Sequence, residues 1–263
     1  MATSNSGILQ TPPKLNYTEA ARETSLQAFR DIVESRRSVR VFTSDPVPDA
    51  VIKECLRLAL LAPNSSNLQP WEFYWIKTQT IKDKVVEACL SQSAAKTAQA
   101  LIVCVARTKT WKQRCRQMLE ALEKNAVKTG ERTPKSVLQY YRKIAPLAYT
   151  QGPLGIIGAM KAIAFFALGF FRAMPREPVS QRGMTLWAVK STALACENLM
   201  LAFRASGFDS CPMEGFDSAR VKKILKLQRD ASVVMVVGAG KRAVNGIYGA
   251  QIRFPSNEFI HEV

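Results

Sequence analysis

Segments with the periodicity of amphipathic helices alternate with short apolar segments along most of this chain, and that alternation limits the folds it can adopt. The short segments are rich in aromatic and β-branched side chains, as strands usually are. No repeat, low-complexity tract or obvious linker separates them. Helices are predicted over residues 25–36, 49–61, 79–92 and 186–207, and strands over 71–77, 100–107 and 232–240.

These elements indicate one α+β domain with layers of the α/β type. A chain of 263 residues with 47% hydrophobic side chains can bury a sizeable core. We expect residues 25–263 to form that domain and residues 1–24, which are mostly polar and contain proline, to be a loosely ordered arm. No segment near the N-terminus has the pattern of a signal peptide, so a cytoplasmic protein is expected.

The chain is strongly basic, with 37 Lys and Arg against 21 Asp and Glu and a formal charge of +16. Half of this excess lies between Arg107 and Lys143, where eleven basic residues accompany three glutamates. Such a balance favours anionic partners. A nucleic-acid-binding or membrane-surface-binding protein is therefore one alternative from a class other than enzymes, and this stretch is expected to form one or two exposed helices.

The cysteines and the histidine restrict the chemistry. The six cysteines show no C-x-x-C spacing and lie mostly in apolar segments, so they are expected to be reduced core thiols. The only histidine, His261, is three residues from the end of the sequence, which argues against histidine-based metal sites and catalytic triads. No metal site is expected, and the chemistry is expected to come from a cofactor.

One apolar segment, residues 153–171, is nearly long enough to cross a bilayer. It contains Lys161 and several glycines, which are unfavourable in a membrane span. We expect a buried or site-covering pair of helices here. A membrane-surface or partner-binding element and a true span remain as alternatives.

Three arginines and a serine follow the first predicted helix in the stretch "ESRRSVRVF". The guanidinium groups of Arg36, Arg37 and Arg40 could hold a phosphate by charge-assisted hydrogen bonds, to which Ser38 would add a hydroxyl. The alternative is a basic last turn that complements the dipole of the helix.

A second polar stretch, "APNSSNLQPWEF", lies between a predicted helix and a predicted strand. Its hydroxyl and amide side chains can donate and accept hydrogen bonds, as is needed to bind the edge of a flat heterocycle, and prolines at both ends would stiffen the loop. An ordinary polar turn is the alternative. The residues concerned are Pro63, Asn64, Ser65, Ser66, Asn67, Gln69 and Pro70.

Two glycine-containing stretches come near the end of the chain. In "CPMEGFD", Glu214 and Gly215 could present backbone N–H groups to a planar ligand, although the stretch also fits a plain turn before a helix capped by Asp217. The stretch "GAGKRA" matches G-x-G-x-x-A, but only twenty residues follow it, too few for a dinucleotide-binding unit. Lys241 and Arg242 in this stretch remain as candidate phosphate ligands.

Taken together and in this order, the motifs resemble those of the FMN-dependent nitroreductase family. The resemblance rests on "RRSVR", "PNSSNLQPW", the helix followed by "CPMEGFD", and the closing "AQIRFPSNEFIHEV". It implies a central mixed β-sheet flanked by helices, in an intertwined homodimer that binds FMN at the subunit interface. No nucleic acid is expected as a partner.

The resemblance also implies roles for individual residues. Arg36 and Ser38 would contact the flavin phosphate or ribityl chain, with Arg37 nearby, and Arg253 would be a further phosphate ligand. Arg40 would lie near N1 and O2 of the ring, where it would stabilise the negative charge of the reduced flavin. The other subunit would supply Pro63, Ser65, Asn67 and Gln69. The stretch near N5 of the ring would supply Pro212, Met213, Glu214 and Gly215.

The implied activity is a ping-pong transfer of hydride from NAD(P)H through FMN to nitroaromatic or quinone-like substrates. Glu214 would position the ring without acting as an acid or base, so no catalytic side chain is assigned. Gln251 stands where relatives commonly have a lysine, and residues 108 to about 180 form a variable, site-covering insertion that matches no family pattern. Reductive dehalogenation, enone reduction and heterocycle oxidation are alternative reactions of the same fold.

Overall fold

Four strands form a sheet at the centre of the fold, in the order β1-β2-β4-β3. The computed structural model describes residues 18–263, and within them the prediction of an α+β fold is confirmed. Each predicted strand is present, and a further one precedes the Glu214–Gly215 turn. The strands are β1 Trp71–Ile76, β2 Ala100–Arg107, β3 Asp209–Met213 and β4 Ala231–Gly240.

All neighbouring pairs of these four strands are antiparallel, whereas the resemblance led us to expect a mixed sheet. β2 and β3 run in the same direction, but β4 lies between them and opposes both. Parallel pairing among the described residues is limited to an isolated bridge between Ser38 and Ser210. Because strands that share a direction are never neighbours, the sheet is antiparallel.

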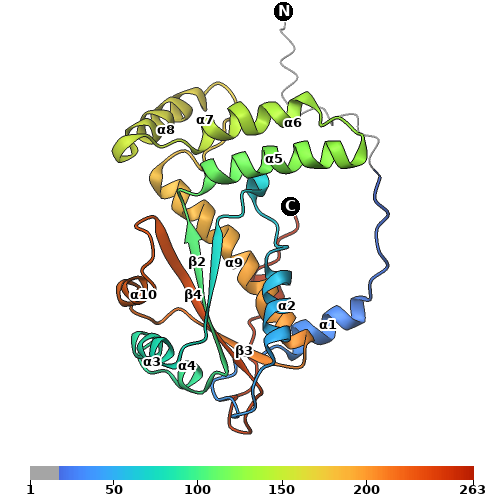
Figure 1. Cartoon of the computed structure of the whole chain (residues 1–263), viewed down its shortest axis with the longest axis vertical. Coiled ribbons are helices and arrows are strands. Elements are labelled where there is room, and N and C mark those ends of the chain that lie inside the picture. Colours follow the sequence, from blue (N-terminus) through green and yellow to red (C-terminus); the bar gives the residue numbers. More distant parts are fainter. Residues whose placement is uncertain (1–17) are drawn as a thin grey trace, which may run out of the picture.

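Helices cover both faces of the sheet (Figure 1). On one side lie α3, α4 and α10, and on the other α2 and the long α9. The helix predicted over 79–92 ends earlier, at Ala88, and Leu90 and Ser91 at positive φ separate α3 from a further short helix, α4. The bounds are α1 Leu26–Ser35, α2 Asp49–Ala59, α3 Gln79–Ala88, α4 Ser93–Thr97, α9 Gln181–Ala205 and α10 Ser218–Ile224.

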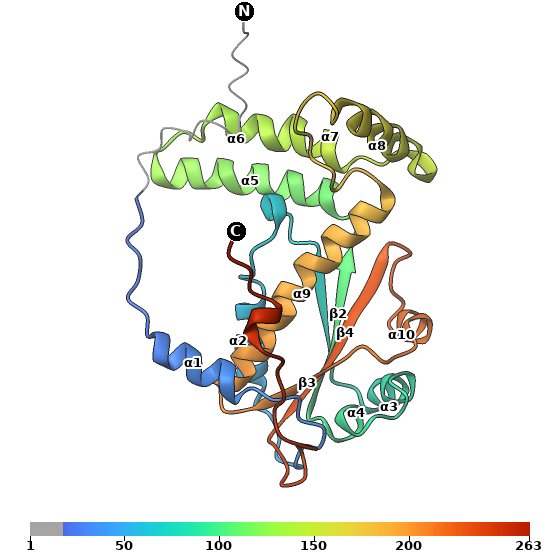
Figure 2. The same cartoon turned by 180° about the vertical axis from the view of Figure 1, so that it is seen from behind.

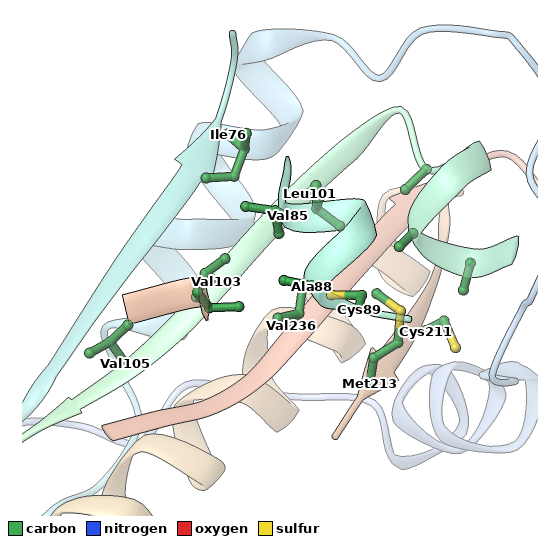
Figure 3. Close-up of a cluster of buried hydrophobic side chains, with 14 of the residues drawn as sticks. Ile76, Val85, Ala88, Cys89, Leu101, Val103, Val105, Cys211, Met213 and Val236 are labelled. Atoms are coloured by element: carbon green, nitrogen blue, oxygen red, sulfur yellow. The ribbon is translucent and has the colours of Figure 1, made fainter. Parts of the chain in front are cut away.

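Strand β2 explains why its sequence is a continuous apolar run. Alternate side chains of this strand enter two different hydrophobic clusters, one on each face of the sheet. Leu101, Val103 and Val105 pack with residues of α3 and β3 in the first cluster (Figure 3). Because both faces are covered, no position along the strand favours a polar side chain. All six cysteines are free and buried, as predicted.

The helix α9 is the largest buried helix. It begins at Gln181, five residues before the predicted start, with the Ser180 hydroxyl accepting a hydrogen bond from Gly183 N–H at 3.1 Å. It ends two residues before Gly207, whose φ of +80° is the left-handed conformation expected after a helix. Its position beside β2, β3 and β4 links the start of β3 to the rest of the core.

A layer of helices lies across one end of the sheet (Figure 1). A third buried cluster, which includes Trp111, Tyr149 and Trp187, attaches this layer to α9. The basic stretch forms its exposed helices, as predicted. The layer consists of α5 Trp111–Thr129, α6 Lys135–Gln139, a π-helical turn Tyr140–Ile144, α7 Ala145–Tyr149 and α8 Ile156–Leu168.

For residues 153–171 we predicted a buried or site-covering pair of helices, and the prediction of burial is wrong. Gly158 is the one buried residue of α8, and most of its large apolar side chains are exposed. The apolar composition correctly indicated a helix, but no other described element covers it. No single helix among residues 18–263 is long and apolar enough to cross a membrane; one pair bent by 70°, residues 135–149 with 153–168, satisfies the length and composition criteria together.

The predicted N-terminal arm lies partly outside the described residues, which exclude residues 1–17. Residues 18–24 form no helix or strand and are exposed. The first helix, α1, begins at Leu26, because Ser25 caps it by accepting a hydrogen bond from Ala28 N–H at 3.2 Å.

Candidate functional site

The arginine cluster lies in an extended segment beside β3 and not in the last turn of α1. That helix ends at Ser35 without a basic residue in its last turn; Arg36 is its C-cap residue, and Arg37 and Arg40 lie beyond it in the extended segment. The extended segment pairs with β3 through the Ser38–Ser210 bridge, and Val39 N–H donates to Ser210 O at 3.1 Å. Its backbone is thereby fixed at the start of β3.

A cavity of about 240 Å³ lies between this segment and residues 247–253. Arg37 closes one side by donating to Gly249 O at 2.6 Å, and the Arg40 guanidinium stands 5.6 Å from the centre of the Tyr248 ring. The structure thus brings the C-terminal Arg253 to the first motif, as the resemblance implied. The cavity is lined by Arg36, Arg37, Ser38, Arg40, Arg253 and residues 247–252.

The cationic side chains of this cavity lack acidic partners. Within residues 18–263, no carboxylate forms an ion pair with Arg36, Arg40 or Arg253. Burial raises the pKa of the nearby Cys211 thiol, and the charges of Arg40 and Arg36 oppose that shift, so this thiol stays protonated beside the cluster. Three guanidinium groups without carboxylates form a site suited to an anion.

Lys241 and Arg242 do not line this cavity. Arg242 forms a two-point contact with the nearly buried Asp209, at 3.0 and 2.7 Å, and Lys241 lies over the Phe208 ring. Arg204 also donates to Asp209, at 3.0 Å. In this chain Arg242 therefore ties the segment after β4 to β3, and the structure does not direct it towards a phosphate.

The Glu214–Gly215 turn follows β3 at its far end from Ser210. Four residues of strand separate Ser210 from Glu214, or about 13 Å. No hydrogen bond within the described chain uses the backbone N–H of Glu214 or Gly215, while Gly215 O accepts from Gln92 Nε2 at 2.7 Å. A Cβ atom added at Gly215 would contact only this Gln92 nitrogen, at 3.6 Å. Packing within the chain therefore does not explain why this residue is a glycine.

The loop over residues 63–69 is not an ordinary polar turn. Ser66, Asn67 and Gln69 have φ values of 61°, 47° and 45°, the left-handed conformation that side chains other than glycine rarely adopt. Asn64 stabilises the loop internally, since its Oδ1 accepts from Gln69 N–H at 2.7 Å. Conformations of this kind persist where the surroundings impose them, and they are frequent at ligand sites. Pro63 at its start is exposed.

Three tyrosines from the helical layer hold this loop. The Ser66 hydroxyl bonds to the hydroxyls of Tyr140 and, at 3.0 Å, Tyr149, and Tyr141 donates to Ser66 O at 3.1 Å. Burial raises the pKa of Tyr149 and of Tyr141, so both phenols stay protonated. Sequence reasoning missed these residues because they lie between residues 108 and 180, where it found no motif. Nothing in the local sequence indicated a partner more than 70 residues away.

One chain does not bring the two halves of the expected site together. Pro70, at the end of the loop, accepts from Arg107 N–H at 2.8 Å, and Arg107 pairs with Ala231. Ser210, beside the arginine cluster, pairs with Ala239 at the other end of β4. The eight intervening residues of strand correspond to about 26 Å. Figure 1 shows the same separation, with the loop near α5 and β3 at the opposite end.

A model of the nitroreductase family matches residues 33–241, most of the chain. The chain belongs to the nitroreductase family. The match includes the arginine cluster, the 63–69 loop and the Glu214–Gly215 turn, so the family's sequence pattern covers every part of the candidate site except the C-terminal segment. Membership of this family supports an oxidoreductase.

Individual relatives match over most of their length. Protein DrgA of Synechocystis is 30% identical over 215 residues, which are 81% of this chain and 83% of DrgA. An NADH dehydrogenase of Thermus thermophilus is 28% identical and covers 80% of this chain and 85% of its own. A protein of Exiguobacterium sibiricum solved in complex with FMN has a TM-score of 0.64 and 25% identity, covering 94% of this chain and 100% of its own.

Proposed function

We propose that this member of the family binds FMN and uses NAD(P)H to reduce flat, electron-poor compounds such as nitroaromatics or quinones. The observation that carries the proposal is the cavity with three guanidinium groups that have no acidic partner within residues 18–263. It lies next to a strand followed by two backbone N–H groups that donate to no described residue. The FMN complex of the Exiguobacterium relative and the name of the Thermus relative support both the cofactor and the electron donor.

The residues present fit FMN. Arg36, Ser38 and Arg253 would hold the phosphate, since all three line the cavity and the arginines lack acidic partners. Arg40 would offset negative charge on the ring. Bound FMN would supply hydride transfer between NAD(P)H and the substrate. A backbone N–H of the Glu214–Gly215 turn would orient the ring, and the exposed face above Gly215 would admit flat molecules.

A homodimer would complete the site. The separation of about 26 Å between the arginine cluster and the 63–69 loop means that the loop of a second copy must supply Ser65, Asn67 and Gln69. The surface is suited to such a partner: α1 buries no residue, and it exposes Leu26, Phe29 and Val33 at helical spacing. The C-terminal segment, drawn in front of α9 in Figure 2, exposes several more apolar side chains.

Mixing two defective variants is expected to restore flavin sites if the site is shared. Arg36→Ala damages the cavity, and Asn67→Ala damages the loop that the partner supplies. A mixed dimer would contain one site with both changes and one site with neither. Unfolding and refolding the two variants together should therefore recover NADH oxidation that neither recovers alone. If the mixture is no more active than the two separate proteins, the shared site is wrong.

The cofactor proposal has a direct spectroscopic test. The purified protein, with FMN added where needed, is expected to show the visible absorbance of a bound flavin, which should bleach when NADH or NADPH is added without oxygen. Nitroaromatics and quinones should then restore the colour. Absence of FMN binding, or bound flavin that neither nicotinamide reduces, would contradict the proposal.

A further inference from the structure

The helix α8 presents apolar side chains to solvent along its whole length. Surface helices of globular proteins normally carry polar side chains on the outward face. In α8, Lys161 is the one charged or polar side chain. α8 lies at the outer corner of the helical layer in both views (Figures 1 and 2). The exposed apolar residues of the helix and the following turn include Ile156, Met160, Ile163, Phe166, Phe170 and Phe171.

Lys161 does not interrupt this surface, because its charge is directed inward. The ammonium group donates to Leu147 O at 2.9 Å and to Ala148 O at 2.8 Å. These carbonyls belong to the last turn of α7, where a cation is favourable. Lys161 is half-buried, and burial lowers its pKa. The outward side of α8 is therefore free of charge.

The chain around this apolar surface is basic. Residues 132–182 contain eight Lys and Arg, of which Lys161 is directed inward and Arg142 pairs with Glu123, and one acidic residue, Glu177. Glu177 is paired with Lys190 at 3.0 Å and so does not neutralise the other cations. Arg172 and Arg176 lie four and eight residues after the end of the helix, and both are exposed. An apolar surface bordered by cations complements the interface of an anionic bilayer, which offers hydrocarbon beneath negative headgroups.

We propose that α8 and the turn to Phe171 dock this protein on the surface of an anionic lipid membrane. The helix would lie in the interface and not cross it, since 13 residues span about 20 Å against a hydrocarbon thickness of about 30 Å. The neighbouring α7 cannot follow it into the lipid, because Ala145 and Tyr149 are buried in the core. A second copy is a poorer occupant, since it would bring the same cations against these.

Vesicle sedimentation with the full chain tests the proposal. The wild-type protein is expected to sediment with phosphatidylcholine vesicles that contain phosphatidylserine, and much less with phosphatidylcholine alone. Ile163→Glu places a charge in the centre of the apolar surface and should weaken the binding about tenfold or more. The matched control is Val127→Glu, an exposed apolar residue of another helix. It makes the same change of charge and should alter binding by less than about twofold.

Three outcomes would overturn the proposal. The first is no binding to either kind of vesicle, and the second is equal weakening by Ile163→Glu and Val127→Glu, which would indicate attraction by net charge alone. The third is that Ile163→Glu, measured without lipid, forms particles of smaller mass than the wild-type protein. That result would show that α8 joins copies of the chain. Vesicle binding is measured on protein mass and does not depend on the flavin, so failure here leaves the proposed enzyme activity standing.

Discussion

Replacing Arg36 by alanine is expected to weaken FMN binding by about 10- to 100-fold, because one hydrogen-bonded ion contact with a phosphate contributes roughly 1.5–3 kcal/mol. Arg36 lines the cavity and has no acidic partner among the described residues, so little else depends on its charge. The dissociation constant can be measured from the quenching of FMN fluorescence. Arg36→Lys keeps the charge but cannot make the two-point contact, so its dissociation constant for FMN should lie between those of the wild type and Arg36→Ala.

The control for this experiment is Arg132→Ala. Arg132 is exposed in the loop after α5 and far from the cavity, and its loss should change FMN binding by less than about twofold. Arg107 would be a poor control, because its side chain is part of the structure. Equal weakening by Arg36→Ala and Arg132→Ala would remove the assignment of the arginine cluster to the phosphate.

Replacing Arg107 by alanine is expected to lower the free energy of unfolding by about 3 kcal/mol. This side chain donates to Asp230 at 3.2 and 3.1 Å and also to Glu72, and so ties β1, β2 and the start of β4 together. The side chain of Asp230 is only 6% exposed. Without Arg107 a buried carboxylate would lose its counter-charge, which costs more than the loss of a surface pair. Urea denaturation measures the difference.

The same contact predicts a dependence on pH. Burial alone would raise the pKa of Asp230, but hydrogen bonds from Arg107 and Lys109 N–H outweigh it and hold the pKa below its usual 3.8. A carboxyl group whose pKa is lower in the folded state stabilises the protein fully at pH values above its unfolded-state pKa. This stabilisation is lost as the pH falls through the folded-state pKa. The difference between wild type and Arg107→Ala should therefore shrink below about pH 3.8.

An exposed ion pair supplies the control for stability. Arg220 pairs with Glu87 at 2.8 Å, and both side chains are more than half exposed. Because solvent screens such pairs, Arg220→Ala should leave the urea midpoint almost unchanged. A midpoint for Arg107→Ala equal to that of Arg220→Ala would show that the contact between Arg107 and Asp230 does not stabilise the sheet.

The sequence predicted the elements that have strong local patterns. β2 was evident because both faces of the strand are covered and its apolar run is unbroken. The end of α9 was evident from Gly207. The order of the four motifs also indicated the family correctly, and the cavity joins two of them, Arg36 and Arg253, within one chain.

The sequence could not predict which groups far apart in the chain form hydrogen bonds or ion pairs with one another. Arg242 looked like a phosphate ligand, but it is paired with Asp209, 33 residues away in the chain. Nothing local in the 63–69 loop indicated that tyrosines of the helical layer hold it. Such pairs depend on the path of the backbone between them.

For this protein, the sequence by itself determined the positions of most helices and strands and the family, because each depends on residue types at short spacing. The tertiary structure alone decided that the two halves of the site lie at opposite ends of one sheet and that α8 is exposed. The physical reason is that hydrophobic periodicity shows that a face must be covered, whereas only the packed chain shows whether its own residues cover it.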